Sequence, residues 1–102
     1  MRILMRILLT AVLWFPAMVA AETVTARGAT LAQACVTCHG PGGHSQGAIP
    51  SLATLSSADI IAALQAFRAE TRQGTVMYRI AKGLDDTDIT AVATYFATLS
   101  KP

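Results

Sequence analysis

The chain has 102 residues, with eight Lys and Arg, six Asp and Glu, and two cysteines. This length allows one small domain, and the few charges leave no basic stripe of the kind that nucleic-acid binding needs. Two cysteines allow one disulfide at most. Without Arg2 and Arg6, six positive residues balance six negative ones. This near-zero charge does not favour strong electrostatic docking with a partner of either sign.

The first 21 residues have the parts of a secretory signal peptide. Arg2 and Arg6 supply its positive start, and residues 7–20 form a mostly apolar run. A run of about 14 residues is short for a membrane span, which needs about 20, so cleavage is favoured over a retained anchor. We expect a signal peptide at residues 1–21, export to the periplasm, and a mature domain at residues 22–102 without a membrane span.

Residues 25–38 are predicted to form the first helix of this domain. Leu31, Ala34, Cys35 and Cys38 recur there at helical spacing. The helix therefore carries both thiols of the chain towards its C-terminal end.

Cys35 and Cys38 are followed at once by His39, in a frame typical of covalent haem attachment. Residues three apart share one face of a helix, so both sulfurs can reach one edge of a porphyrin and form thioethers with its two vinyl groups. His39 then stands beside the second thioether, where its imidazole can ligate the iron. The predicted cofactor is one covalently bound haem c.

Three other interpretations of the cysteine pair are weaker. A thioredoxin-like redox pair normally lies near a βαβ pattern, which this sequence lacks. A zinc site needs about four ligands, and beyond Cys35, Cys38 and His39 only His44 is available among cysteines and histidines. A disulfide between residues three apart would close a small, strained loop that stabilises little.

A loop and a second helix follow. Residues 40–50 are rich in glycine and proline and have no periodicity, which predicts a loop. Residues 57–70 are predicted to be helical, with Ser56 and Asp59, or the neighbouring Ser57, at the N-terminus. The apolar stripe of this helix consists of Ile60, Ile61, Leu64 and Phe67. The charges off this stripe, expected on a solvated face, are Arg68, Glu70 and Arg72.

Two more helical segments complete the chain. Residues 75–82 contain Met77 and a short helix that Gly83 ends. Residues 85–99 are predicted to form the last helix, with acidic residues at its start, where they suit the helix dipole. Its expected buried face consists of Ile89, Val92, Ala93 and Phe96, flanked by Tyr95 and Leu99. No strand pattern is present, so the fold is predicted to be all-α.

Met77 is the predicted second axial ligand of the iron. It is the only methionine after the signal peptide and lies 38 residues beyond His39, far enough for the chain to cross to the distal side of the haem. The alternative role is that of a core gap-filler. His44 is a weaker candidate ligand, because it lies only five residues after His39. His/Met ligation raises the potential and closes the iron to substrate, so we expect electron transfer and no catalytic residue.

The sequence resembles a class I cytochrome c. The resemblance is carried by residues 35–40, by residues 49–52 and by Met77. It implies four to five short helices wrapped around one covalently bound haem, with the first and last helices crossing. Gly28 and Leu31 match one side of that crossing, and Tyr95 with Phe96 the other. It also implies that the backbone carbonyl of Pro50 accepts a hydrogen bond from His39 and orients it.

Residues 75–84, with 88–89 and 95–96, are similar to the cytochrome subunit of flavocytochrome c sulfide dehydrogenase. This resemblance implies a partner subunit that contains FAD, oxidises sulfide and passes electrons to the haem. The alternative is a free-standing carrier that serves several redox partner proteins. A ligand sensor or peroxidase with an open iron would require Met77 to dissociate.

Overall fold

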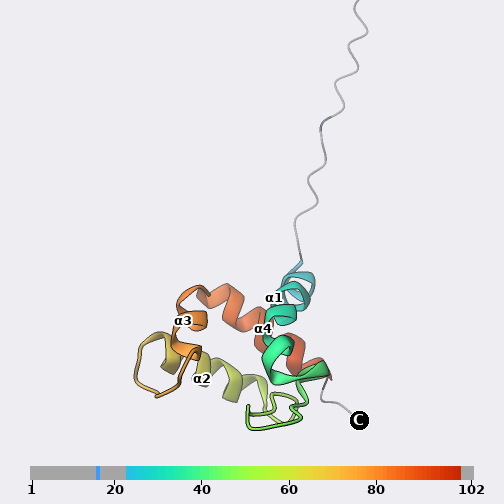
Figure 1. The fold of residues 1–102 in the computed structure, drawn as a ribbon. Coiled ribbons are helices and arrows are strands. Elements are labelled where there is room, and N and C mark those ends of the chain that lie inside the picture. Colours follow the sequence, from blue (N-terminus) through green and yellow to red (C-terminus); the bar gives the residue numbers. More distant parts are fainter. Residues whose placement is uncertain (1–15, 17–22, 100–102) are drawn as a thin grey trace, which may run out of the picture.

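The computed structural model describes residue 16 and residues 23–99, and every regular element in that part of the chain is helical (Figure 1). The elements are α1 (Val24–His39), the 3₁₀ turn η1 (Pro41–Gly43), α2 (Ser57–Arg68), α3 (Met77–Lys82) and α4 (Asp86–Leu99). The predicted all-α fold of four to five short helices is confirmed. The predicted signal peptide lies outside the described residues, apart from residue 16.

Helix α1 begins and ends within one residue of its predicted bounds. The Thr23 hydroxyl caps it by accepting a hydrogen bond from the Ala26 amide at 3.1 Å. Gly40 ends it with a φ of 90° and donates its N–H to the Val36 carbonyl. A side chain at Gly40 would collide with the backbone carbonyl of His44. Only glycine therefore permits the sharp turn that directly follows the cysteine and histidine motif.

Helix α2 has the predicted capping box. The Ser56 hydroxyl accepts from the Asp59 amide at 3.1 Å, and the Asp59 carboxylate accepts from the Ser56 amide at 3.4 Å. The helix ends at Arg68, two residues before the prediction, because Glu70 adopts a left-handed φ of 58°. The amides of Glu70 and Thr71 then cap the last free carbonyls, those of Phe67 and Ala66, in the arrangement known as a Schellman motif.

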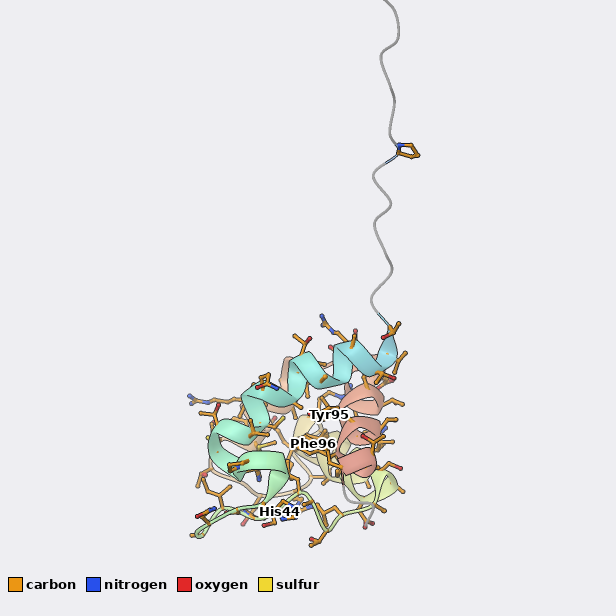
Figure 2. The ribbon with its side chains drawn as sticks, turned by 90° about the vertical axis from the view of Figure 1, so that its right-hand side faces the viewer. His44, Tyr95 and Phe96 are labelled. Atoms are coloured by element: carbon orange, nitrogen blue, oxygen red, sulfur yellow. The ribbon has the colours of Figure 1, made fainter. Side chains whose placement is uncertain are left out.

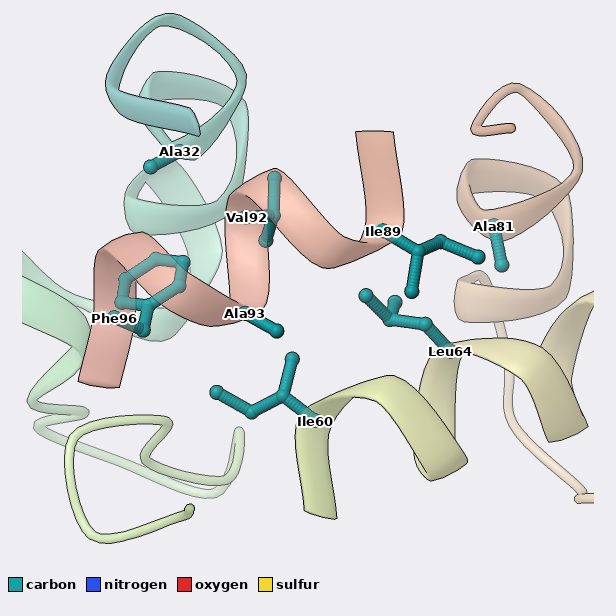
Figure 3. Packing of buried hydrophobic residues seen from close by; sticks show 8 residues of the cluster. All are labelled: Ala32, Ile60, Leu64, Ala81, Ile89, Val92, Ala93 and Phe96. Carbon is teal, nitrogen blue, oxygen red and sulfur yellow. The ribbon is translucent and has the colours of Figure 1, made fainter. Parts of the chain in front are cut away.

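Helix α4 lies at the centre of the core and packs against both α1 and α2, while α3 packs on α2. Figure 3 shows that every helix contributes side chains to one cluster of buried residues. These residues are Ala32, Ile60, Leu64, Ala81, Ile89, Val92, Ala93 and Phe96. The predicted buried face of the last helix is thus confirmed, whereas Ile61 and Phe67 of the α2 stripe are only partly buried.

Helices α1 and α4 approach each other closely at Gly28. A Cβ atom at Gly28 would collide with the Ala91 carbonyl oxygen and lie 3.1 Å from the Tyr95 Cβ. Figure 2 shows Tyr95 and Phe96 of α4 at this crossing, where their rings make an edge contact with centroids 5.6 Å apart. The crossing of first and last helices that the resemblance implied is therefore present, and Gly28 lies at its closest point.

Candidate haem site

Cys35 and Cys38 lie in the last two turns of α1 and differ in environment. Cys35 is partly buried against the core, and its thiol points to the Leu31 carbonyl at 3.8 Å. Burial raises the pKa of the Cys35 thiol, although a hydrogen bond with the backbone of Cys35 itself acts in the opposite direction. Cys38 is exposed, and both thiols are free. The disulfide interpretation is therefore not supported, and both sulfurs are available for other bonds.

His39 is the last residue of α1, and its ring is oriented by a single hydrogen bond. Its Nδ1 lies 2.5 Å from the Pro50 carbonyl oxygen. Because a carbonyl can only accept, Nδ1 carries a proton, and in the neutral ring the lone pair is then on Nε2. Within residues 23–99, Nε2 has no hydrogen-bond partner. This is the bond that the resemblance implied for Pro50, and it leaves Nε2 as the nitrogen that can bind a metal.

The loop between α1 and α2 is tied so that Pro50 comes back to His39. The buried Gly43, with a φ of 80°, accepts hydrogen bonds from the amides of Leu52 at 2.8 Å and Ala53 at 3.1 Å. The Ser45 amide donates to the Ser51 hydroxyl at 2.8 Å. The loop, which was predicted to lack regular structure, thus contains one 3₁₀ turn and three hydrogen bonds that join its two ends. These ties fix the carbonyl that holds His39.

Met77 is the first residue of α3 and packs, partly buried, against the core. The segment before it folds over the ring of Phe67. The Arg72 guanidinium lies 5.0 Å from the ring centroid, and a Cβ at Gly74 would lie 2.8 Å from a ring carbon. His44, the weaker candidate ligand, is an exposed residue of the loop below α1 (Figure 2). Ligation of iron by Met77 stays a prediction.

Sequence reasoning missed the role of Arg68, and its assignment to a solvated face was wrong. Its guanidinium donates to the Leu84 carbonyl at 3.2 Å and to the Asp86 carboxylate at 2.5 Å. These bonds join the end of α2 to the junction of α3 and α4, and so help to place the helix that Met77 begins. The partners lie 16 and 18 residues away, where helical spacing gives no signal.

The side chains present fit a haem. Partly buried apolar side chains from three segments pack against the core while keeping some surface open: Cys35, Val36, Leu52, Leu55, Ile61 and Phe67. A porphyrin is a flat apolar group that such surfaces can cover. The two free thiols could form the thioether bonds of a covalently attached haem, and the unpartnered Nε2 could bind its iron. No three His, Cys, Asp or Glu side chains of the described region converge on a metal position, so zinc gains no support.

The family profile of cytochrome c matches residues 25–100. The chain therefore belongs to the cytochrome c family, is an electron-transfer protein, and carries covalently bound haem c. The predicted class I cytochrome c fold is confirmed by this match together with the all-helical architecture.

Two curated proteins show what the chain is similar to. It is 43% identical over 75 residues to the cytochrome subunit of sulfide dehydrogenase of Chlorobaculum tepidum, covering 74% of this chain and 68% of that protein. It is 41% identical over 71 residues to the thiosulfate dehydrogenase electron acceptor of Stutzerimonas stutzeri, covering 66% of this chain and 33% of that protein. Of the helices described, none is long and apolar enough to cross a membrane.

Proposed function

We propose that the mature domain holds its haem through Cys35 and Cys38, ligates the iron with His39 and Met77, and transfers electrons in the periplasm after cleavage of residues 1–21. The observation that carries this proposal is the hydrogen bond between His39 Nδ1 and the Pro50 carbonyl. It fixes the neutral tautomer with Nε2 free and makes that nitrogen a stronger donor.

The haem, when bound, takes up and releases one electron at a time. Around it, the chain has a positioning role. Cys35 and Cys38 anchor the group to the rigid helix α1, and the ties at Gly43 keep Pro50 against His39. The thioether of Met77 favours the reduced state. If His39 and Met77 both held the iron, no open position would be left for substrate, which would suit transfer of electrons without bond making.

The electron donor that we propose is an FAD-containing, sulfide-oxidising protein, with this chain as its haem subunit. The likeness to the cytochrome subunit of sulfide dehydrogenase supports this choice. The likeness to a thiosulfate dehydrogenase electron acceptor favours the second candidate, a free-standing carrier that serves several partners.

Gentle purification from the native periplasm separates the two candidates, with an absorption spectrum and a mass measured on the same sample. Haem bands together with flavin absorbance in a larger complex are expected for the subunit. Haem bands alone on a species of one domain would favour the free carrier. Absence of covalent haem would overturn the whole proposal.

Replacement of Met77 tests the ligand set. Met77→Ala should keep the haem attached, because both cysteines remain, while lowering the potential and allowing carbon monoxide to bind the reduced protein. His44→Ala is the matched control and should change neither property. An unchanged potential and a closed iron in Met77→Ala would exclude Met77 as the ligand.

Replacement of Cys38 tests the attachment. Cys38→Ala removes one thioether and should lower the yield of holoprotein or abolish it, whereas Thr37→Ala between the two cysteines should not. A normal yield and an unaltered spectrum in Cys38→Ala would contradict attachment through this residue.

A further inference from the structure

Helix α3, which begins with Met77, has few of the features that hold a helix in place. It has six residues, and Val76 at its start supplies no side-chain cap. A helix this short is unstable on its own, because its first turn fixes several residues for a single hydrogen bond. Its backbone lies close to α2 and to no other helix of the part of the chain that the structure describes (Figure 1). The position of Met77 therefore depends on contacts outside α3.

The chain that leads into α3 gives Met77 limited support. Residues 71–76 are all exposed. The amides of Thr71 and Arg72 both donate to the Ala66 carbonyl, at 2.9 and 3.4 Å. These bonds end at Arg72, well before Met77, so firmer support is expected at the C-terminal end of α3.

The corner after α3 is closed by backbone hydrogen bonds and by one arginine. The Gly83 amide donates to the Ile80 carbonyl at 3.1 Å, and the Leu84 amide donates to the Ala81 carbonyl at the same distance. The Leu84 carbonyl in turn accepts a hydrogen bond from Arg68, the last residue of α2, at 3.2 Å. This series of bonds connects the end of α3 to the end of the helix on which it packs.

Arg68 uses both terminal nitrogens of its guanidinium at this corner. One donates to the Leu84 carbonyl, and the other donates to the carboxylate of Asp86, the first residue of α4, at 2.5 Å. A lysine has a single ammonium group and does not reproduce this planar, two-pronged contact.

Burial decides which polar link to α3 matters most. The bond from Arg68 to the Leu84 carbonyl is partly buried, whereas the side chain of Asp86 is 80% exposed. The other polar link, between Lys82 and Glu70, joins side chains that are 49% and 60% exposed. Exposed ion pairs contribute little, while a charged donor on a partly buried carbonyl makes one of the stronger hydrogen bonds. The bond between Arg68 and Leu84 is therefore the main polar support of this corner.

We propose that Arg68 is a positioning residue for the iron: by holding the corner after α3, its guanidinium limits how often Met77 leaves the metal. The proposal rests on the proposed function, because it requires Met77 to be the axial ligand. Arg68 acts through α3 and not through contact with the haem. A foreign ligand can bind the iron only in the fraction of molecules whose methionine has dissociated, so its apparent affinity reports how firmly Met77 is held.

Titration of the ferric holoprotein with imidazole, followed by the loss of the absorption band of methionine-ligated haem, measures this fraction. Arg68→Lys keeps the positive charge at the end of α2 but removes the two-pronged contact. It should bind imidazole roughly three- to tenfold more tightly than the natural protein. Its potential should be lower, because a methionine that is bound for less of the time favours the reduced state less. Asp86→Asn leaves the carbonyl bond in place and should stay within about twofold of the natural protein.

Arg27→Lys is the matched control, because it makes the same replacement at another arginine that pairs with a carboxylate of α4. Arg27 lies 3.1 Å from the Asp88 carboxylate, on helix α1, whose backbone does not approach α3 in the described segment. Urea unfolding of both variants records their loss of stability, and imidazole affinity in Arg27→Lys should stay within about twofold of the natural value. Equal tightening of imidazole binding in the two lysine variants would overturn the proposal, because a general loss of stability would then explain it.

A double-mutant cycle shows whether Arg68 acts through Met77. Met77→Ala should bind imidazole far more tightly than the natural protein, and adding Arg68→Lys to it should change nothing further, because no methionine is left to position. Further tightening in the double variant would mean that Arg68 acts on the iron by another route, against the proposal.

Two failures remain distinguishable in the same titrations. If Met77→Ala binds imidazole tightly while Arg68→Lys keeps the natural affinity and potential, the positioning role of Arg68 is wrong and the proposed ligand set stands. If Met77→Ala binds imidazole no more tightly than the natural protein, Met77 is not the ligand, and the role of Arg68 fails with it.

Discussion

The two sides of this molecule are held together by different forces. At the crossing of α1 and α4, shape dominates: Gly28 admits the Ala91 backbone, and Phe96 and Val92 are fully or almost fully buried. On the side of α2 and α3, buried residues are joined by a polar cap and by arginine contacts to the half-buried rings of Phe67 and Tyr78, and the whole segment 71–76 is exposed. The predicted thioether anchors belong to the first side, while Met77 belongs to the second.

This difference separates residues that set the stability of the domain from residues that adjust the surroundings of Met77. Close packing leaves little room for change, because even small volume changes in a dense core are destabilising. Contacts on the surface, such as the Arg72 guanidinium over Phe67, can alter without unfolding the domain. We therefore expect changes at the crossing to act on the free energy of unfolding, and changes around Met77 to act on the proposed ligation of the iron.

The largest effect is expected from Gly28→Val. Any Cβ here collides with the Ala91 carbonyl, and two further methyl groups force the helices apart, so the free energy of unfolding should fall by roughly 2–3 kcal/mol. Urea unfolding of the holoprotein measures it. Gly47→Val is the matched control, because a Cβ at Gly47 meets no atom within 4 Å. Equal losses in both variants would show that the crossing is not tightly packed.

A second, pH-dependent effect is expected from Asp88, which links the crossing to the start of α4. The Asp85 backbone amide, and then Arg27, lower the pKa of the Asp88 carboxyl. An unfolded Asp has a pKa of about 3.9. The stabilisation is therefore present above about pH 4 and is lost as the pH falls through the lower folded pKa.

Unfolding of Asp88→Asn in urea at a series of pH values measures this contribution. The variant should be less stable than the natural protein at neutral pH, and the gap should narrow as the solution becomes acidic. Arg27→Gln removes one of the two causes and should reproduce part of the same trend. A gap that stays constant from neutral to strongly acidic pH would exclude this role for Asp88.

Local patterns made much of the fold predictable. Helical spacing identified the face formed by Ile89, Val92, Ala93 and Phe96, and the Ser56 and Asp59 pair located the start of α2. Both signals arise from residues that are three or four positions apart, which a sequence displays directly. The cysteine and histidine motif is equally local, so the haem could be predicted.

Features that depend on distant partners could not be predicted in this way. Arg68 was assigned to solvent because its partners, Leu84 and Asp86, are brought near only by the turn between helices. Glu70 was placed inside α2 because nothing in a glutamate indicates a left-handed φ. The ion pairs of Arg27 with Asp88 and of Lys82 with Glu70 were hidden in the same way, since the sequence does not reveal which cations find carboxylates.

A smaller and more local effect is expected from Gly74→Ala, in the segment before Met77. Its Cβ would lie 2.8 Å from the Phe67 ring, so the segment leading to Met77 must shift. The free energy of unfolding should fall by only about 1 kcal/mol, while the absorption band of methionine-ligated ferric haem should weaken or move. A loss of unfolding free energy as large as that of Gly28→Val, with an unchanged absorption band, would show that this segment acts on stability and not on ligation. Gly47→Ala serves as the control.

The smallest effect is expected at Glu70, and it should be stabilising. A left-handed φ costs a residue with a side chain about 1–2 kcal/mol, which Glu70→Gly relieves. Greater freedom of glycine in the unfolded chain offsets about 0.4–1 kcal/mol of this gain. The pair with Lys82 at 3.2 Å joins side chains that are 60% and 49% exposed, so its loss costs little. We expect a net gain of about 0.5 kcal/mol in urea unfolding.

Glu70→Gln removes the charge but keeps the strained backbone, so it should not stabilise. Stabilisation in both variants would assign the gain to charge instead of backbone.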